Sequence, residues 1–324
     1  MESQVKKTSK FKEFLSRYGM ASLFTLPFIV CFIFFTVVPI FIGLYLSFFK
    51  YNPMMPEKME FVGLDNYINL FLNDEYDIVA YYFWPALGKT LLFTILTVPI
   101  MFFFPLFLAV LINYEPPGYK IFRSILYLPC ILSISTAGIL FVTIFGMNES
   151  SLFNAFFHTN INFLENEVLR WIVMILLSVW WQSGTNFVIF SAALKNVPKS
   201  LYEACESDGG NRFSSFIHVT LPNIKGSLTI CLFNTLIGYL SLYGQPTVIK
   251  GEINADSIDS PLMLLQDWLN DMTFASMTGY LTAVAIIFGI FVMIISLTQR
   301  YLMGLEKGGH KREEQYKTLQ SLKK

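Results

Sequence analysis

Residues 201–222 read LYEACESDGGNRFSSFIHVTLP, a polar segment between two long apolar ones. Pro198 suits the first turn of a helix and the glycine pair that begins at Gly209 suits its end, so one short helix is predicted between them. Asn211 can cap a second helix, which is expected to end before Pro222 because a residue preceding proline avoids the α region. Such a helix-turn-helix is too polar to lie in lipid, and its form is that of a docking element at a membrane surface.

The composition indicates a membrane protein, with 54% hydrophobic and only 14% charged residues. A soluble globule of this size would be left with a large sticky surface. A helix needs about 20 apolar residues to cross a bilayer, and six segments qualify: about 20–49, 86–112, 121–147, 170–194, 226–249 and 277–303. We therefore predict an all-α integral membrane protein with six transmembrane helices. The net charge of zero favours neither nucleic acid nor an acidic substrate as a partner.

The lysines and arginines predict the orientation, because these residues are retained on the cytoplasmic side of membrane proteins. Both ends of the chain, the loop between spans two and three, and the loop 195–225 together hold 18 of the 23. We therefore expect 1–19 to be a cytoplasmic N-terminal segment, 20–303 the six-span domain and 304–324 a cytoplasmic basic tail. The loop 195–225, between spans four and five, is then cytoplasmic too. The first span is too long for a cleaved signal and is interpreted as a retained anchor.

The sequence shows no energy source of its own. Gly88-Lys89-Thr90 is similar to the end of a nucleotide-binding loop, but Phe83 stands where the first glycine of that motif belongs. No acidic residue, lysine or arginine lies near the middle of a predicted span, so the usual marks of an ion-coupled pump are missing. The four cysteines share no CxxC spacing and the three histidines are scattered, so no metal site is predicted. Any function that consumes energy would therefore require a partner to supply it.

The fourth predicted span has the richest polar content. Trp181, Gln182, Thr185 and Asn186 offer an aromatic face, two amides and a hydroxyl, which suit the apolar faces and hydroxyl rim of a sugar. Trp181 and Thr185 are four positions apart and so share a helical face. Interhelical packing is the other interpretation, because small polar residues join membrane helices and Trp often anchors at an interface. The residues alone leave both open.

The polar segment resembles the signature loop of permease subunits of binding-protein-dependent ABC importers. The family pattern is Glu-Ala-Ala, two residues, Asp-Gly-Ala, then a Phe, an apolar residue and Leu-Pro. This chain has Glu203-Ala204-Cys205, Asp208-Gly209-Gly210, Phe216, Val219 and Leu221-Pro222, with Cys205 and Gly210 in place of alanines. The resemblance to the sugar-transporting branch extends to residues 62–67, 123–129, 197–202 and 279–283, and so covers nearly the whole chain.

The resemblance implies that the loop docks on an ATP-hydrolysing subunit. Glu203 would meet donor groups in a cleft of that subunit, Ala204 would permit close approach, and Gly209 would make a turn with positive φ. Asp208 falls in the last turn of the first helix, where a carboxylate opposes the helix dipole at a cost of about 0.3–1 kcal/mol, so a compensating group is expected. The partner would bind ATP and magnesium, and this chain would be neither an enzyme nor the holder of a cofactor.

The resemblance also implies where a solute is bound. In the sugar-binding permease of the maltose importer, the stretch equivalent to Trp181–Thr185 and the region around Ser241 and Tyr243 make substrate contacts. The implied substrate-binding residues are Trp181, Gln182, Thr185, Asn186, Ser241 and Tyr243. After Pro246 the chain departs from the family, because Ile249-Lys-Gly-Glu252 stands where Thr-Gly-Gly-Pro is usual.

The expected function is that of a permease subunit that forms the translocation path for a sugar, with an oligosaccharide favoured by the aromatic content. The implied partners are a second six-span permease, two ATP-binding subunits and an extracellular lipid-anchored solute-binding protein, in the cytoplasmic membrane of a bacterium. The alternative is a stand-alone channel or secondary transporter of a small polar solute, although no ring of charged residues supports a pore. A membrane enzyme is a weaker alternative, because no nucleophile and base fall at a common depth.

Overall fold

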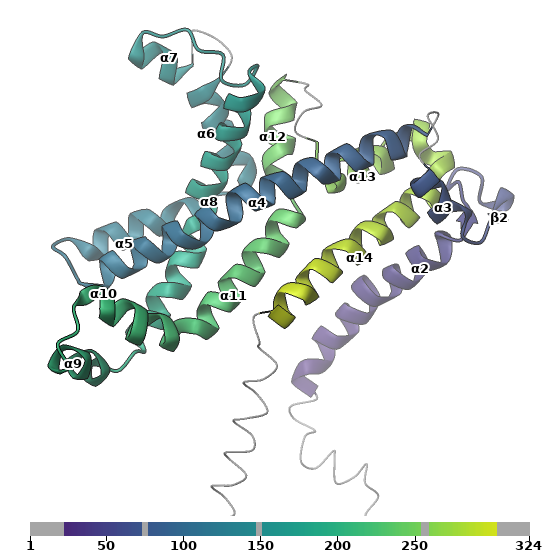
Figure 1. The fold of residues 1–324 in the computed structure, drawn as a ribbon. Helices are drawn as coiled ribbons and strands as arrows, with labels where there is room; N and C mark the ends of the chain where they lie inside the picture. The colour runs from purple at the N-terminus through teal and green to yellow at the C-terminus, as the bar shows by residue number, and fades with distance from the viewer. Residues whose placement is uncertain (1–22, 73–76, 147–150, 254–258, 303–324) are drawn as a thin grey trace, which may run out of the picture. The chain divides into compact units, whose positions relative to one another are not determined.

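The computed structural model describes residues 23–72, 77–146, 151–253 and 259–302 (Figure 1). The predicted cytoplasmic segments 1–19 and 304–324 lie outside these ranges. The chain separates into two compact units, of which the first contains the chain up to Leu72 with Asp271–Ile286, and the second contains Asn73–Asn270 with the chain from Ile287. Apart from one two-stranded hairpin, the regular structure in the described ranges is helical, as predicted.

The first unit begins with a helix over Leu23–Leu46 that contains a π-helical turn. Its elements are η1 (Ile33–Val37), α2 (Val38–Leu46), β1 (Phe49–Lys50), η2 (Pro56–Lys58), β2 (Glu60–Phe61), α3 (Asp65–Leu72), η6 (Met272–Met277) and the first turns of α14 (Thr278–Leu302). The two strands pair antiparallel, with Phe49 opposite Phe61.

Asn66 fixes the turn between α2 and β1. Its buried amide donates to the carbonyls of Ser47 at 2.8 Å and Phe49 at 3.1 Å. Helix α14 approaches the same turn so closely that an added Cβ at Gly279 would collide with the Phe49 carbonyl. The stretches 62–67 and 279–283, which both carry the family resemblance, therefore meet at the end of the first span.

The second unit is built around three long helices. Its elements are α4 (Ile78–Asn113), α5 (Tyr119–Tyr127), η3 (Leu128–Ile131), α6 (Ile134–Phe145), α7 (Leu152–Phe157), α8 (Glu167–Lys195), α9 (Lys199–Ser207), α10 (Arg212–Ser215), η4 (Phe216–Thr220), α11 (Leu221–Leu240), α12 (Gly244–Ile253), α13 (Pro261–Asn270) and the remainder of α14. Helices α4, α8 and α11 pack on one another. Two buried apolar clusters join them, one around Phe93 and Tyr239 and the other around Phe187 and Ile224.

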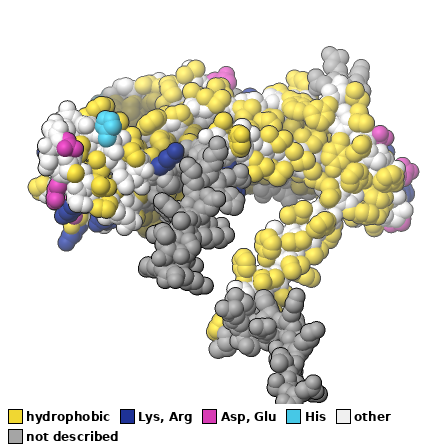
Figure 2. Space-filling model, turned by 60° about the horizontal axis from the view of Figure 1, so that its bottom comes forward, with side chains coloured by type: hydrophobic (Ala, Val, Ile, Leu, Met, Phe, Trp, Pro, Cys, Tyr) yellow, Lys and Arg dark blue, Asp and Glu magenta, His cyan; other side chains and the backbone are white. Residues whose placement is uncertain are grey.

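The outward surface is apolar as well. Figure 2 shows hydrophobic side chains in yellow over much of the visible face, and they include phenylalanines that expose most of their area, such as Phe34, Phe103 and Phe107. Water does not tolerate an apolar surface of this extent on a monomer, whereas lipid does. The exposed faces of the helices are therefore suited to a membrane.

Within the described ranges, five helices are long and apolar enough to span a membrane: Leu23–Leu46, Ile78–Asn113, Glu167–Lys195, Arg212–Gly251 and Met272–Leu302. The helices Tyr119–Ile131 and Ile134–Phe145 meet at a bend of 102° and supply a sixth if the pair is one span. The segment 121–147, which was predicted as a span, therefore forms two helices that meet at a sharp bend. Pro129 has no N–H with which to continue a helix, and Ser133 starts a new one by accepting from Thr136 N at 3.2 Å.

The second helix of the polar segment also differs from the prediction. It does not end before Pro222, because α10, the π-helical η4 and α11 follow one another without a break. In η4 the N–H of Leu221 donates to the Phe216 carbonyl, five residues back. This wider turn relieves the crowding that a proline ring causes in the preceding turn, so Pro222 lies within the first turn of α11.

Candidate coupling loop and solute path

Helix α9 has one face fixed to the protein and one face free. Tyr202 and Cys205 are half-buried and pack on the cluster around Phe187 and Ile224, and the hydroxyls of Tyr202 and Thr220 lie 3.0 Å apart. The predicted docking residues Glu203 and Ala204 are both exposed. The short helix is thus anchored on its inner side and presents its outer side, as a docking element must.

The end of α9 is a Schellman motif. Gly209 has φ +81°, its N–H donates to the Glu206 carbonyl at 3.0 Å, and the N–H of Gly210 donates to the Cys205 carbonyl at 2.8 Å. This pair of hydrogen bonds defines the motif and requires the left-handed residue that glycine adopts most cheaply. The prediction that Gly209 makes a turn with positive φ is confirmed.

Asp208 is the C-cap residue of α9 and is exposed. Within the described ranges its side chain has neither an ion pair nor a hydrogen bond. The compensating group expected for a carboxylate at this end of the helix is therefore not supplied by the described part of this chain. Asn211 caps α10 as predicted, because its Oδ1 accepts from Ser214 N at 2.8 Å.

Cys205 and Gly210 pack closely against each other, so a larger residue at position 210 would collide with Cys205. A Cβ at Gly210 would lie 2.6 Å from Cys205 Sγ and 2.8 Å from the Cys205 carbonyl. We expect Gly210→Ala to destabilise the loop by about 1 kcal/mol, the lower end for overpacking, as a lower midpoint of thermal unfolding in detergent. Cys205→Ala in the same chain should restore part of the loss, because it removes only the sulfur contact. An unchanged midpoint in Gly210→Ala would contradict this close packing.

Two of the residues predicted to bind solute in α8 are engaged inside the protein. The indole N–H of the half-buried Trp181 donates to the Leu132 carbonyl at 2.8 Å, which ties α8 to the bend before α6. Asn186 is buried, and its Nδ2 donates to the Met101 carbonyl at 3.1 Å and to Thr235 Oγ1 at 2.9 Å. Asn186 therefore joins α8 to α4 and α11, which is the packing interpretation that the sequence left open.

Gln182 and Thr185 lie toward the surface of the unit. Thr185 is exposed and Gln182 is partly exposed, with its Nε2 3.7 Å from the position of a Cβ at Gly238 in α11. Asn234, which sequence reasoning missed, is exposed four residues before Gly238 and seven before Ser241, so these three share a helical face. An exposed amide inside an apolar span is costly unless it meets a polar partner. The presence of Asn234 in the fifth predicted span, on the same helical face as Ser241, could therefore have identified it from the sequence.

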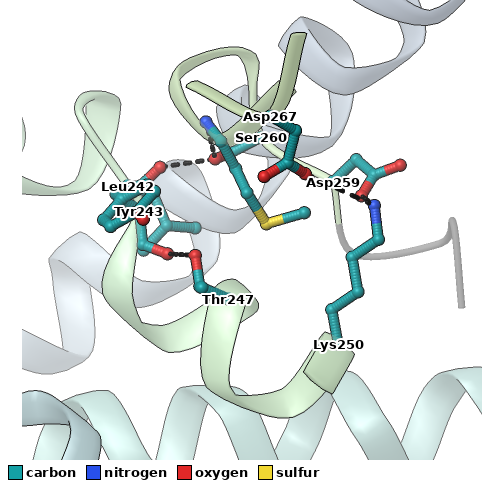
Figure 3. Close-up of polar contacts among 8 residues, drawn as sticks. Leu242, Tyr243, Thr247, Lys250, Asp259, Ser260 and Asp267 are labelled. Atoms are coloured by element: carbon teal, nitrogen blue, oxygen red, sulfur yellow. Dashed lines mark hydrogen bonds and ion pairs between the residues drawn. The ribbon is translucent and has the colours of Figure 1, made fainter. Parts of the chain in front are cut away.

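The helix is interrupted at Ser241–Tyr243, between α11 and α12, and two of the predicted solute contacts lie in this break. Figure 3 shows how the break is held. Ser260 Oγ, from the start of α13, donates to the Leu242 carbonyl at 2.5 Å, and Thr247 Oγ1 donates to the Tyr243 carbonyl at 2.6 Å. Ser241 and Tyr243 are partly exposed, whereas Leu242 between them is buried. Discontinuous helices of this kind form the binding sites of many transporters.

An ion pair holds the segment before α13 against α12 (Figure 3). Lys250 Nζ lies 2.7 Å from Oδ1 of the buried Asp259 and 3.9 Å from Oδ2 of the exposed Asp267. We expect Asp259→Asn to lower the free energy of unfolding by about 1–2 kcal/mol, between the effects of surface and buried pairs. Asp267→Asn is the matched control and should change it by less than about 0.5 kcal/mol. Chemical denaturation in detergent measures both, and equal effects would contradict the role of Asp259.

A family model described as "Binding-protein-dependent transport system inner membrane component" matches residues 83–303. The chain belongs to this family. It is therefore a membrane permease component of an ABC importer, and the resemblance seen in the signature loop is confirmed. The alternative of a stand-alone channel or secondary transporter finds no support.

The permease is similar over most of its length to curated relatives. It is 34% identical over 304 residues to the arabinooligosaccharides transport system permease protein AraP of Bacillus subtilis (strain 168), covering 91% of this chain and 92% of the relative. It is 28% identical over 286 residues to the lactose transport system permease protein LacF of Rhizobium radiobacter, covering 86% and 92%. A solved bacterial alginate ABC transporter, in complex with alginate pentasaccharide-bound periplasmic protein, matches with a TM-score of 0.76 at 21% identity, covering 91% and 98% of the two chains. This last match shows the permease fold.

Proposed function

We propose that this permease forms part of the translocation path for an oligosaccharide, driven by ATP hydrolysis in partner subunits. The observation that carries the proposal is the near full-length similarity to the arabinooligosaccharide permease AraP, and the lactose and alginate transport named for the other two relatives is consistent with a saccharide. The proposed assembly contains a second permease, two ATP-binding subunits that hold ATP and magnesium, and a lipid-anchored solute-binding protein outside the cell. The proposed location is the cytoplasmic membrane of a bacterium.

The outer face of α9 is the proposed contact with the ATP-binding subunit. It consists of Glu203, Ala204, Asp208 and Gly209, all exposed. The carboxylate of Asp208 at the C-terminal end of α9 has no compensating group among the described residues, and a donor on the docked subunit would supply one. A closing motion of the ATPase pair would then move α9, and with it α8 and the helix that starts at Arg212.

The orientation proposed from lysine and arginine places α9 and α10 in the cytoplasm, with six spans and both chain ends on that side. In a variant without native cysteines, Ser214→Cys should resist an impermeant thiol reagent in intact cells and react after permeabilisation. Asn160→Cys, between α7 and α8, should react in intact cells. The reverse labelling would overturn the orientation.

The solute path is proposed along the polar face that α8 and α11 share. Gln182, Thr185, Ser241 and Tyr243 would contact the solute, and we add Asn234 to the proposal because it is exposed on α11. Trp181 and Asn186 would shape the wall through their hydrogen bonds to neighbouring helices. Amide and hydroxyl groups beside aromatic rings suit sugar hydroxyls and apolar sugar faces.

The test is uptake by the reconstituted importer. The permease, its partner permease, the ATP-binding subunits and the cognate binding protein are placed in vesicles, and uptake of arabinose is compared with that of labelled arabinooligosaccharides of two to five units. ATP-dependent uptake of oligosaccharides above the monosaccharide supports the proposal. Uptake of glycerol phosphate with no response to any saccharide would overturn the substrate class while leaving the family intact.

A further inference from the structure

The loop between α6 and α8 contains a short helix with an exposed apolar face. Helix α7 packs on α6, and Figure 1 shows it beyond the end of α6. Leu152, Ala155 and Phe156 are exposed on α7, Leu152 by 57% and Phe156 by 78%. Positions i, i+3 and i+4 lie on one side of a helix, so these three side chains form a single outward face, called here the α7 face.

Hydrogen bonds fix the loop that carries the α7 face. Asn154 is buried on the inner side of α7, where its Nδ2 donates to the Ile161 carbonyl at 2.9 Å. Its Oδ1 accepts from Ile161 N at 3.1 Å and from Thr159 Oγ1 at 2.9 Å. The buried Arg170 of α8 donates from Nε to the Leu164 carbonyl at 2.6 Å. The loop therefore has a defined shape in which the α7 face points outward.

Aromatic rings fill the space behind the α7 face. The ring of Phe153 lies 5.8 Å from that of Phe145 in α6, 4.9 Å from that of Phe163 and 4.6 Å from that of Phe157, measured between centroids. Because these rings occupy the inner side of α7, Phe156 cannot be buried by turning inward. An apolar face held outward in this way is unfavourable in water, so another surface must cover it.

The surroundings of the α7 face favour lipid as this cover. Residues 151–164 contain no Asp, Glu, Lys or Arg, so the loop has no ion-pairing group with which to orient a protein partner. The apolar surface also continues onto both flanking helices. Helix α6 exposes Ile139 by 59%, and α8 exposes Val168 by 67% and Ile172 by 47% from its first turns onward. The α7 face thus adjoins surface that is already suited to a membrane.

We propose that α7 is an interfacial anchor, which inserts Leu152, Ala155 and Phe156 into the lipid layer at the end of α8 opposite α9. The three side chains would lie among the upper parts of the acyl chains, the depth at which aromatic and aliphatic residues of interfacial helices are found. Asn160 and Asn162, which are exposed in the same loop, would lie in the headgroup layer or in water. This inference depends neither on the transported solute nor on which side of the membrane α9 occupies.

The test is the accessibility of a nitroxide spin label in the complete importer complex, reconstituted in phospholipid vesicles. In a variant without native cysteines, the label is attached through Phe156→Cys, Ala155→Cys or, as the control in the same loop, Asn160→Cys. Relaxation by oxygen, which dissolves in lipid, is compared with relaxation by a water-soluble nickel complex. We expect the oxygen-to-nickel ratio at positions 155 and 156 to exceed that at position 160 at least about tenfold, because a polar complex is strongly disfavoured in apolar surroundings.

Other covers of the α7 face predict different results. The measurement is made with and without the liganded solute-binding protein. A label at position 156 that nickel reaches until the binding protein is added would identify that protein as the cover, and a label that neither reagent reaches would identify another protein subunit. Either result, or equal ratios at positions 156 and 160, would overturn the lipid anchor. Phe156 and Ala155 are both exposed, so neither substitution removes a buried side chain and the two labels give independent readings.

Discussion

Replacing Glu203 with alanine is expected to reduce solute-stimulated ATP hydrolysis by the assembled importer about a hundredfold. Tyr202 and Cys205 fix the inner face of α9, whereas the Glu203 side chain is exposed and has no ion pair or hydrogen bond in the described ranges. If it pairs with donors of the ATP-binding subunit, removing it leaves those donors buried and unpaired. That loss is worth about 2–5 kcal/mol at an interface, and a hundredfold change is about 2.7 kcal/mol.

Glu206→Ala is the matched control for this variant. Glu206 has the same charge on the same helix, but it lines a cleft toward α4 and α8. ATP hydrolysis is measured in vesicles with saturating liganded binding protein, and the amount of assembled complex is measured in parallel. Full stimulation in Glu203→Ala, or an equal loss in Glu206→Ala, would show that the outer face of α9 is not the coupling contact.

Gly184→Ala is expected to destabilise the folded permease by about 3 kcal/mol, the upper part of the usual range for overpacking. Helix α8 crosses the α5–η3 segment at this glycine, and an added Cβ would lie 2.7 Å from the Leu126 carbonyl and 3.1 Å from Tyr127 Cα. Both contacts are with backbone, so no change of rotamer relieves them. The helices would have to separate, which also strains the nearby hydrogen bond between Trp181 and Leu132.

The controls for Gly184→Ala are Gly88→Ala and Gly226→Ala, where an added Cβ meets no atom within 4 Å. Both are helical positions, so the change in helix propensity is shared by all three variants. Thermal unfolding in detergent and the yield of membrane-inserted protein measure the effect. A Gly184→Ala protein as stable as these two controls would contradict the close crossing of α8 and α5.

The candidate coupling loop could be predicted in detail because its signals are local. Pro198, Gly209 and Asn211 each act through the backbone within a few residues, and the structure places a helix start, a left-handed turn and a helix cap at these positions. The expected stop before Pro222 was wrong because it assumed ordinary α-helical spacing. The π-helical turn η4 changes that spacing, and nothing in the local pattern of residues indicates it.

The candidate solute path could be predicted only in part. Composition indicated a polar region in the fourth span. Within it, however, Thr185 is exposed whereas the adjacent Asn186 is buried. Asn186 turns toward Met101 and Thr235, residues 85 and 49 positions away in the chain. Such partners depend on which helices lie beside α8, so the residue pattern could not separate packing from solute contact.

The sequence by itself determined that this protein is a helical membrane permease with a short polar helix between two apolar segments. These features can be read from the order of the residues. They are the length and continuity of the apolar segments, the residues that start and stop helices, and the sequence motif in residues 203–222. Tertiary structure alone decided the fixation of the break at Ser241–Tyr243 by Ser260 and the inward use of Asn186. Each depends on a hydrogen bond or close contact between segments distant in sequence, and such pairings are selected by the packing of the whole bundle.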